Sequence, residues 1–350
     1  MKRLLFLACW SFAISSQAGD GALLNTLPQN SIQSAFQILR RDYIRREDLS
    51  FEELNRAALQ GLLERLDFGA SLEATDAKRA AVKPYIQSEF LAPDVAYLRP
   101  ETYAEGEGAL FEKALRGMVE KKAQHLVLDL RAPSSGGLFE EAALMLQCFL
   151  PAGELMFKLK QMGRDDAEMF VSKQEPLWKG RVVILIDREI CSAAETLAAC
   201  LKQRGDAFLI GEKTKGATVR YDSLKLDDKA LLRYASAEML LPDGTSLFKK
   251  GLEPDFLIQG SMKDKQRVFQ ESRSQTMKPF VVDHVRHRFN EAALVSGNNP
   301  ELDDYVKRSK GEPLPGNGGQ LRDVVVQRAL DTLQAGTQRG ESRIKWEAKP

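Results

Sequence analysis

The chain has 350 residues, with 50 lysine and arginine residues against 49 aspartate and glutamate residues, 43% hydrophobic residues and 28% charged residues. This composition is typical of globular proteins and excludes collagen-like, low-complexity and disulfide-scaffold chains. A net charge of +1 provides no broad attraction for nucleic acid or for an anionic membrane surface, so both partners are disfavoured. The length predicts one large domain with appendages, or two domains.

The first residues have the pattern of a secretory signal peptide. Lys2 and Arg3 precede an apolar run over 4–14, and small and polar residues follow up to Ala18. We therefore expect residues 1–18 to be a signal peptide and the mature protein to be periplasmic or secreted. The run is shorter than the ~20 residues of a transmembrane helix, and no later run approaches that length, so we expect no integral membrane segment in the mature chain.

Three cysteines remain after the expected signal peptide: Cys148, Cys191 and Cys200. An odd number among apolar neighbours favours buried thiols over a disulfide framework.

Residues 19–92 are predicted to form an N-terminal helical segment and a linker. Apolar residues recur at three- and four-residue steps from Ser31 to Tyr43, which predicts an amphipathic helix. A second helix is predicted from the capping box Ser50–Glu53 to about Leu66. Residues 69–93 are mixed and polar and predict a short helix with a linker.

Residues 93–260 alternate between buried strands and helices, which predicts an α/β core with parallel pairing. Strands are expected at 95–98, 125–130, 182–186 and 208–211, with helices at 108–121, 138–150 and 192–204. Two longer strands, 219–226 and 231–241, are predicted to form a hairpin through Asp227 and Asp228. Ligands in such sheets bind at the carboxyl ends of the strands.

Residues 261–350 are predicted to be a polar, mostly helical C-terminal extension. Helices are expected near 265–275, 280–294 and 321–333, with a loop rich in proline and glycine at 311–319. The pattern leaves open whether this extension packs on the core or mediates assembly, and it leaves the oligomeric state open.

Two junctions between a strand and a helix could carry chemistry, because both place a helix N-terminus at the same end of the sheet. At the first, Gly136 and Gly137 let backbone amides approach a ligand. At the second, the hydroxyl of Ser192 and the amide of Ala193 can face one substrate carbonyl, as a nucleophile and an oxyanion donor do. The alternative for Ser192 is a capping box with Glu195, in which the serine only caps its helix.

A nucleophilic serine needs a base, and lysine can serve when it is neutral. Lys213 and Lys215 follow the predicted strand 208–211, and for both the alternative is a solvated surface charge. The histidines are unpromising, because His125 begins a buried strand while the other two lie in the polar extension. Histidine and cysteine show no metal-ligand spacing, so we expect no metal site.

Six motifs together resemble the C-terminal processing, or tail-specific, serine proteases. They occur in the order of that family at Phe36–Tyr43, Ala58–Asp67, Leu128–Arg131 with Gly136 and Gly137, Ser192–Glu195, Gly211–Thr214 and Gly251–Asp255. The resemblance implies a crotonase-like βα spiral core and a serine–lysine dyad that cuts exported proteins without a cofactor. It places the nucleophile on Ser192, one oxyanion donor on Ala193, and the other on Gly136 or Gly137.

The sequence departs from this family pattern in two ways. About twenty-five residues separate Leu72 from the first predicted core strand, whereas the PDZ domain of the family needs roughly ninety, so we expect a variant without a PDZ domain. Ungapped alignment from Ser192 places Ala217 where the family has its catalytic lysine. Lys215, followed by Gly216 as in the lysine–glycine pair of the family, is the expected replacement, and Lys213 is a poorer one.

These expectations lead to one main hypothesis and two alternatives. The main hypothesis is an exported serine endopeptidase that cuts protein or peptide substrates, with Ser192 as nucleophile and Lys215 as base. Ala217 and the missing PDZ domain motivate the first alternative, an inactive pseudoprotease that binds extended peptides or proteins in the same groove. A weaker alternative is a carrier of apolar ligands, because crotonase-like cores also occur in retinoid-binding proteins.

Overall fold

The computed structural model describes residues 24–75, 83–132, 137–205, 207–281 and 321–338. The chain divides into two compact units, residues 1–67 and residues 68–350. The expected signal peptide, the loop at 311–319 and Gly136 lie outside the described residues.

The first unit contains two helices, α2 (Gln29–Asp42) and α3 (Phe51–Leu66), joined through the short 3-10 helix η1 (Arg46–Asp48). The side chain of Ser50 accepts a hydrogen bond from the amide of Glu53 at 3.1 Å and so caps α3. Both predicted helices are confirmed. Neither helix contains a buried residue, so their apolar faces are exposed.

The main sheet of the second unit has the strand order β11-β8-β7-β4-β3-β2. Its strands are β2 (Ile86–Ala92), β3 (Val95–Pro100), β4 (His125–Asp129), β7 (Arg181–Ile186), β8 (Ala207–Gly211) and β11 (Phe256–Leu257). All neighbours pair in parallel except β2, which is antiparallel to β3. Continuous apolar runs fit this arrangement, because parallel strands are buried on both faces.

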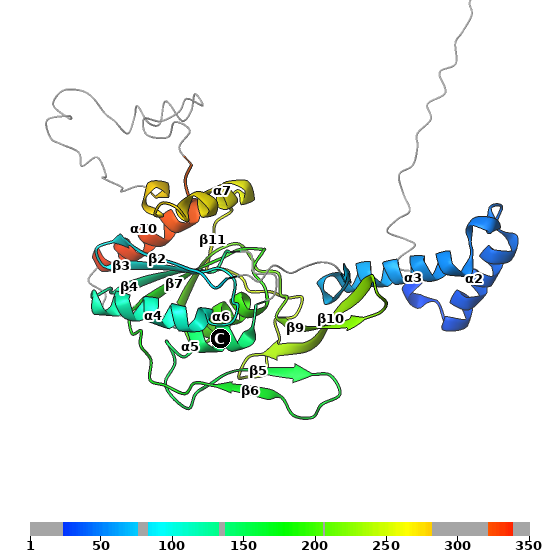
Figure 1. Ribbon diagram of the computed structural model, residues 1–350, viewed down its shortest axis with the longest axis horizontal. Helices are drawn as coiled ribbons and strands as arrows, with labels where there is room; N and C mark the ends of the chain where they lie inside the picture. Colours follow the sequence, from blue (N-terminus) through cyan, green and yellow to red (C-terminus); the bar gives the residue numbers. More distant parts are fainter. Residues whose placement is uncertain (1–23, 76–82, 133–136, 206, 282–320, 339–350) are drawn as a thin grey trace, which may run out of the picture. The chain divides into compact units, whose positions relative to one another are not determined.

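Helices cover both faces of the main sheet (Figure 1). One face carries α4 (Glu107–Glu120), α5 (Phe139–Leu146) and α6 (Ser192–Gln203), and the other carries α7 (Met262–Ser272) and α10 (Val324–Gln338). Successive residues of β4 alternate between the two cores: Leu126 and Leu128 join the cluster with α4–α6, whereas Val127 joins the cluster with α7 and α10. The predicted α/β core is confirmed, and its C-terminal helices pack on it.

A second sheet has the order β1-β10-β5-β6, with β9 paired to β10. Its strands are β1 (Ala70–Ala74), β5 (Leu155–Gln161), β6 (Glu168–Val171), β9 (Val219–Lys225) and β10 (Ala230–Leu240). The predicted hairpin is confirmed, since β9 and β10 are antiparallel with Leu231 opposite Lys225. Asp227 closes its turn by accepting hydrogen bonds from the amides of Lys229 and Ala230 at 2.8 and 2.7 Å.

Several expected boundaries were wrong. The described parts of residues 69–93 form strands β1 and β2 where a short helix and a linker were expected, because β1 pairs with β10 and β2 pairs with β3; residues 76–82 lie outside the described residues. Helix α5 ends at Leu146, earlier than the predicted residue 150. The predicted helix at 280–294 lies almost entirely outside the described residues, and the described part ends in the 3-10 helix η3 (Lys278–Phe280).

Across the described part of the chain, no helix combines the length and apolar character needed to cross a bilayer. Within the described ranges, Cys148, Cys191 and Cys200 form no disulfide; Cys148 and Cys200 are buried as expected, while Cys191 is partly exposed. Burial raises the pKa of the Cys148 thiol to about 12, which marks it as an unreactive packing residue.

Candidate active site

Ser192 lies where the connection from β7 becomes helix α6. Cys191 is the N-cap of this helix, without a capping side-chain hydrogen bond, and Ser192 is its first helical residue. The φ of Ser192 is +46°, in the left-handed region that residues with a side chain rarely adopt. The capping-box interpretation of Ser192 is therefore wrong, and the strained backbone instead has the form found at functional sites.

The polar groups of Ser192 contact the segment that precedes and begins β9. The amide of Ser192 donates to the carbonyl of Ala217 at 2.9 Å. Its hydroxyl lies 3.2 Å from the carbonyl oxygens of both Ala217 and Val219. Ser192 is 1% exposed, so in this structure the hydroxyl is a buried donor to the backbone.

Glu195 lies one helical turn after Ser192 and contacts the same loop. Its Oε1 accepts hydrogen bonds from the hydroxyl of Thr214 and, at 2.8 Å, from the amide of Gly216. Its Oε2 is buried and has no hydrogen-bond partner among the described residues. Burial raises the pKa of Glu195 to about 7, although its hydrogen bonds to Thr214 and Gly216 oppose the shift.

Two glycines give the loop its shape. Gly216 has a φ of +75°, and a Cβ there would lie 2.6 Å from the amide nitrogen of Gly251. Gly251 has a φ of +69°, and a Cβ there would lie 2.3 Å from the carbonyl oxygen of Thr214. Residues 214–217 therefore pack against the chain at 247–251 at a distance that only glycine allows.

In the structure both candidate lysines contact groups other than the hydroxyl of Ser192. Lys215 is exposed, and its Nζ lies 5.2 Å from the centre of the Phe68 ring. Lys213 is also exposed, and its Nζ lies 2.6 Å from a carboxylate oxygen of Glu253. Ala217 is buried beside Ser192, and its methyl side chain supplies no base.

The candidate oxyanion donors are described in part. The amide of Ala193 has no hydrogen-bond acceptor within the described ranges and belongs to the first turn of α6, where such amides attract negative charge. Gly137 packs against Tyr103, because a Cβ at Gly137 would lie 2.1 Å from the Cβ of Tyr103. Gly136 lies outside the described residues.

Sequence reasoning treated Glu195 only as the end of a capping box and so missed its contact with the loop at 214–216. The signal was its spacing: residues i and i+3 share a helix face, so an acid three residues after a candidate nucleophile faces the same segment. The contact partners Thr214 and Gly216 required the tertiary structure.

Residues 94–258 match the profile of peptidase family S41. A CtpA-like serine protease of Staphylococcus epidermidis is 31% identical over 137 residues, which are 39% of this chain and 28% of that protein. The carboxy-terminal processing protease CtpA of Bacillus subtilis is 28% identical over 169 residues, 48% of this chain and 36% of that protein. The chain thus matches only about a third of the length of these relatives.

Among solved structures, a candidate peptidase from Parabacteroides merdae superposes with a TM-score of 0.52 at 15% identity, covering 69% of this chain and 85% of that one. This likeness concerns the fold alone. The crotonase-like form of the core and the absence of a PDZ domain stay predictions. Residues 94–258 of this α/β chain are therefore similar to peptidase family S41, and the curated relatives it resembles include a carboxy-terminal processing protease.

Proposed function

We propose that this chain is an exported serine endopeptidase that hydrolyses peptide bonds of protein substrates, with Ser192 as its nucleophile. The observation that carries the proposal is the left-handed backbone of Ser192 at the start of α6, inside the segment that matches the S41 family. This junction places the hydroxyl of Ser192 next to the amide of Ala193, which has no acceptor in the described part of the chain. The pattern of residues 1–18 supports export.

In the proposed reaction, Oγ of Ser192 attacks the substrate carbonyl while its proton passes to the neutral amine of Lys215. The amides of Ala193 and of Gly136 or Gly137 stabilise the oxyanion. The protonated Lys215 then gives its proton to the leaving amine, and water hydrolyses the acyl-enzyme. Because Lys215 lies over Phe68 in the structure, this role requires its side chain to rotate toward Ser192.

A second candidate function is a peptide-binding protein of the same fold without hydrolysis. Two observations favour it: Ala217 occupies the place beside Ser192, and the hydroxyl of Ser192 is held by two backbone carbonyls. Such a protein would still bind an extended peptide along a strand edge.

The experiment that separates these functions compares the purified wild type with Ser192→Ala and Lys215→Ala on unfolded casein. We expect hydrolysis by the wild type and a loss of about 10³-fold or more in kcat for both variants, since removing one member of a catalytic pair removes most of the rate. Lys213→Ala is the matched control and should retain activity. Equal hydrolysis by wild type and Lys215→Ala contradicts the role of Lys215, and peptide binding without turnover establishes the second function.

A further inference from the structure

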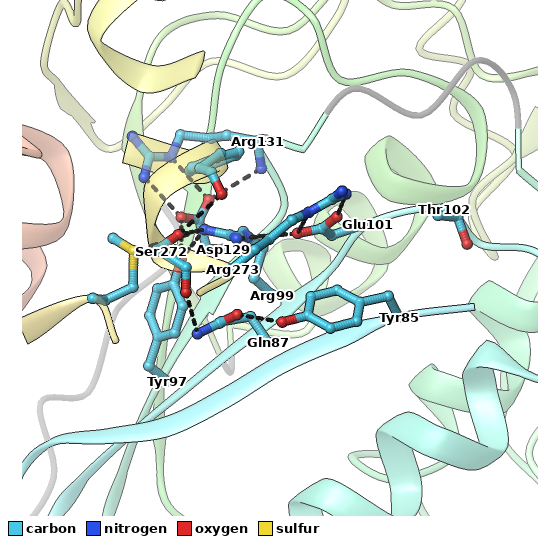
Figure 2. A network of polar contacts seen from close by, with 12 residues as sticks. Tyr85, Gln87, Tyr97, Arg99, Glu101, Thr102, Asp129, Arg131, Ser272 and Arg273 are labelled. Carbon is cyan, nitrogen blue, oxygen red and sulfur yellow. Dashed lines mark hydrogen bonds and ion pairs between the residues drawn. The ribbon is translucent and has the colours of Figure 1, made fainter. Parts of the chain in front are cut away.

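Arg131 is a buried cation that follows the carboxyl end of β4. It pairs with Asp129, the last residue of that strand. Its Nε and Nη2 donate to the two carboxylate oxygens of Asp129 at 2.8 and 2.7 Å (Figure 2). The hydroxyl of Tyr97 also donates to Asp129, at 2.8 Å. Burial opposes ionisation of Asp129, but the charge of Arg131 overrides it and holds the pKa of Asp129 below its ordinary value.

A second carboxylate reaches Arg131 from the C-terminal extension. Asp323 precedes α10, and its carboxylate oxygens accept from Nη1 and Nη2 of Arg131 at 3.1 and 2.8 Å. The same carboxylate accepts from the amides of Val325 and Val326 at 3.1 and 3.0 Å and so caps α10. Asp323 thus links the N-terminus of α10 to the buried side chain of Arg131.

The backbone of Arg131 is held as firmly as its side chain. Its amide donates to Asp129 at 3.1 Å, and its carbonyl accepts from Nζ of Lys265 in α7 at 3.0 Å. Lys265 is itself buried and pairs with Asp187, which follows β7, at 2.6 Å. Two helices of the extension therefore fix one residue of the core, although they lie outside the segment that matches the S41 family.

Arg131 is the point where the chain leaves β4 on its way to α5, and Gly137 precedes α5. Downstream, this connection is held by the amide of Leu138, which donates to the carbonyl of Tyr103 at 2.9 Å, and by the close packing of Gly137 on Tyr103. At the upstream end of the connection, the contacts of Arg131 hold the chain in place.

We infer that Asp323 is a positioning residue: by holding Arg131, it fixes the start of the β4–α5 connection, which leads along the chain to Gly136 and Gly137, the two candidate oxyanion donors. This inference rests on the proposed peptidase function and gives the C-terminal extension a part in it. The carboxylate acts through Arg131 and touches no reacting atom.

The chemistry of Asp323→Asn shows why the charge matters. Asparagine still caps α10, but its amide offers Arg131 one acceptor and turns an NH₂ group toward other N–H donors. One guanidinium N–H group then loses its partner in a buried site, and Asp129 is the one carboxylate among the described residues that still pairs with Arg131. An anchor displaced by even 1 Å is enough to lower turnover about 100-fold.

The test compares wild type, Asp323→Asn and a matched control, Asp331→Asn, which makes the same change on α10 away from Arg131. For Asp323→Asn we expect kcat on a casein-derived peptide to fall about 10-fold or more while KM changes by less than about 3-fold. Hydrogen exchange should accelerate in fragments that contain Arg131 or Gly137 and not in fragments of α4. Asp331→Asn should resemble the wild type in both measurements.

Three outcomes would decide against the inference or separate it from the proposed function. Unchanged kcat in Asp323→Asn overturns it, and so does faster exchange throughout the second unit, because that marks a general loss of stability. If Asp323→Asn does not fold, Asp323→Glu replaces it in the test, because it keeps the charge on a longer side chain. A kcat of Asp323→Glu equal to that of the wild type also overturns the positioning role of Asp323. If the wild type itself shows no hydrolysis dependent on Ser192, the proposed function fails, and the exchange data alone decide whether Asp323 anchors this connection.

Discussion

At the scale of single residues, the site is defined by backbone strain and burial. Ser192 has a positive φ and a buried hydroxyl, and its amide and hydroxyl both contact the carbonyl of Ala217. A residue in this conformation costs about 1–3 kcal/mol, which the surrounding contacts offset. Glu195 is a titratable group that contacts the loop beside Ser192, so its protonation state affects the same segment.

The titration of Glu195 gives a prediction for stability. Its folded-state pKa of about 7 lies above the ordinary value of 4.5, so the folded protein retains a proton that the unfolded chain has released. The contribution of Glu195 to stability is therefore present below about pH 4.5 and is lost as the pH rises through 7, by about 3 kcal/mol in total. Glu195→Gln cannot titrate at this position. As the pH rises, its free energy of unfolding should therefore increase relative to that of the wild type by that amount.

Urea denaturation at pH 5 and pH 8 measures this difference. Glu112→Gln, on the outer face of α4, controls for removal of one carboxylate. Wild type and Glu195→Gln with parallel pH profiles would show that Glu195 does not titrate in this range.

At the scale of elements, the loop at 214–217 depends on a close approach of two chain segments. Gly216→Ala would place a Cβ 2.6 Å from the amide nitrogen of Gly251 and 2.7 Å from the carbonyl of Leu247, at a positive φ. We expect a loss of about 2–4 kcal/mol in the free energy of unfolding, from the left-handed conformation and the forced displacement of backbone.

Gly117→Ala in α4 is the matched control for this substitution. Its Cβ would meet nothing within 4 Å, so the change should stabilise the helix by up to about 1 kcal/mol. Equal free energies of unfolding for the two variants in guanidinium would refute the close approach at Gly216.

At the scale of the whole molecule, the C-terminal helix α10 belongs to the core of the second unit. Val326 is fully buried in the cluster that α7 and α10 form on the sheet, whereas Val324 on the same helix is 52% exposed. Val326→Ala should lower the free energy of unfolding by about 2 kcal/mol, from lost burial and the cavity left behind.

Val324→Ala removes the same two methyl groups from a solvent-exposed position and should change stability by less than about 0.5 kcal/mol. Chemical denaturation of both variants gives the comparison. A similar loss in the two valine variants would mean that α10 does not pack on the sheet as described.

The elements that sequence predicted well have strong local signals. The cap of α3 is formed by Ser50 and Glu53. The buried run His125–Asp129 forms a strand in any fold that covers both faces of its sheet. Strands β1, β5 and β6 carry no comparable signal, because they exist through pairing: Ala70 lies opposite Tyr234, and Leu159 lies opposite Met239 and Glu168. Such short segments become strands only when a distant partner supplies their hydrogen bonds.

The sequence by itself determined the α/β alternation, the junction at Ser192 and the ordered motifs of the family, because each depends on residues close together in the chain. Only the tertiary structure decided that Lys215 lies over Phe68, that Ala217 receives the hydroxyl of Ser192, and that Asp323 meets Arg131 across 192 residues. Such contacts follow from how helices and strands pack, and the periodicity of any one segment carries no information about its partner in space.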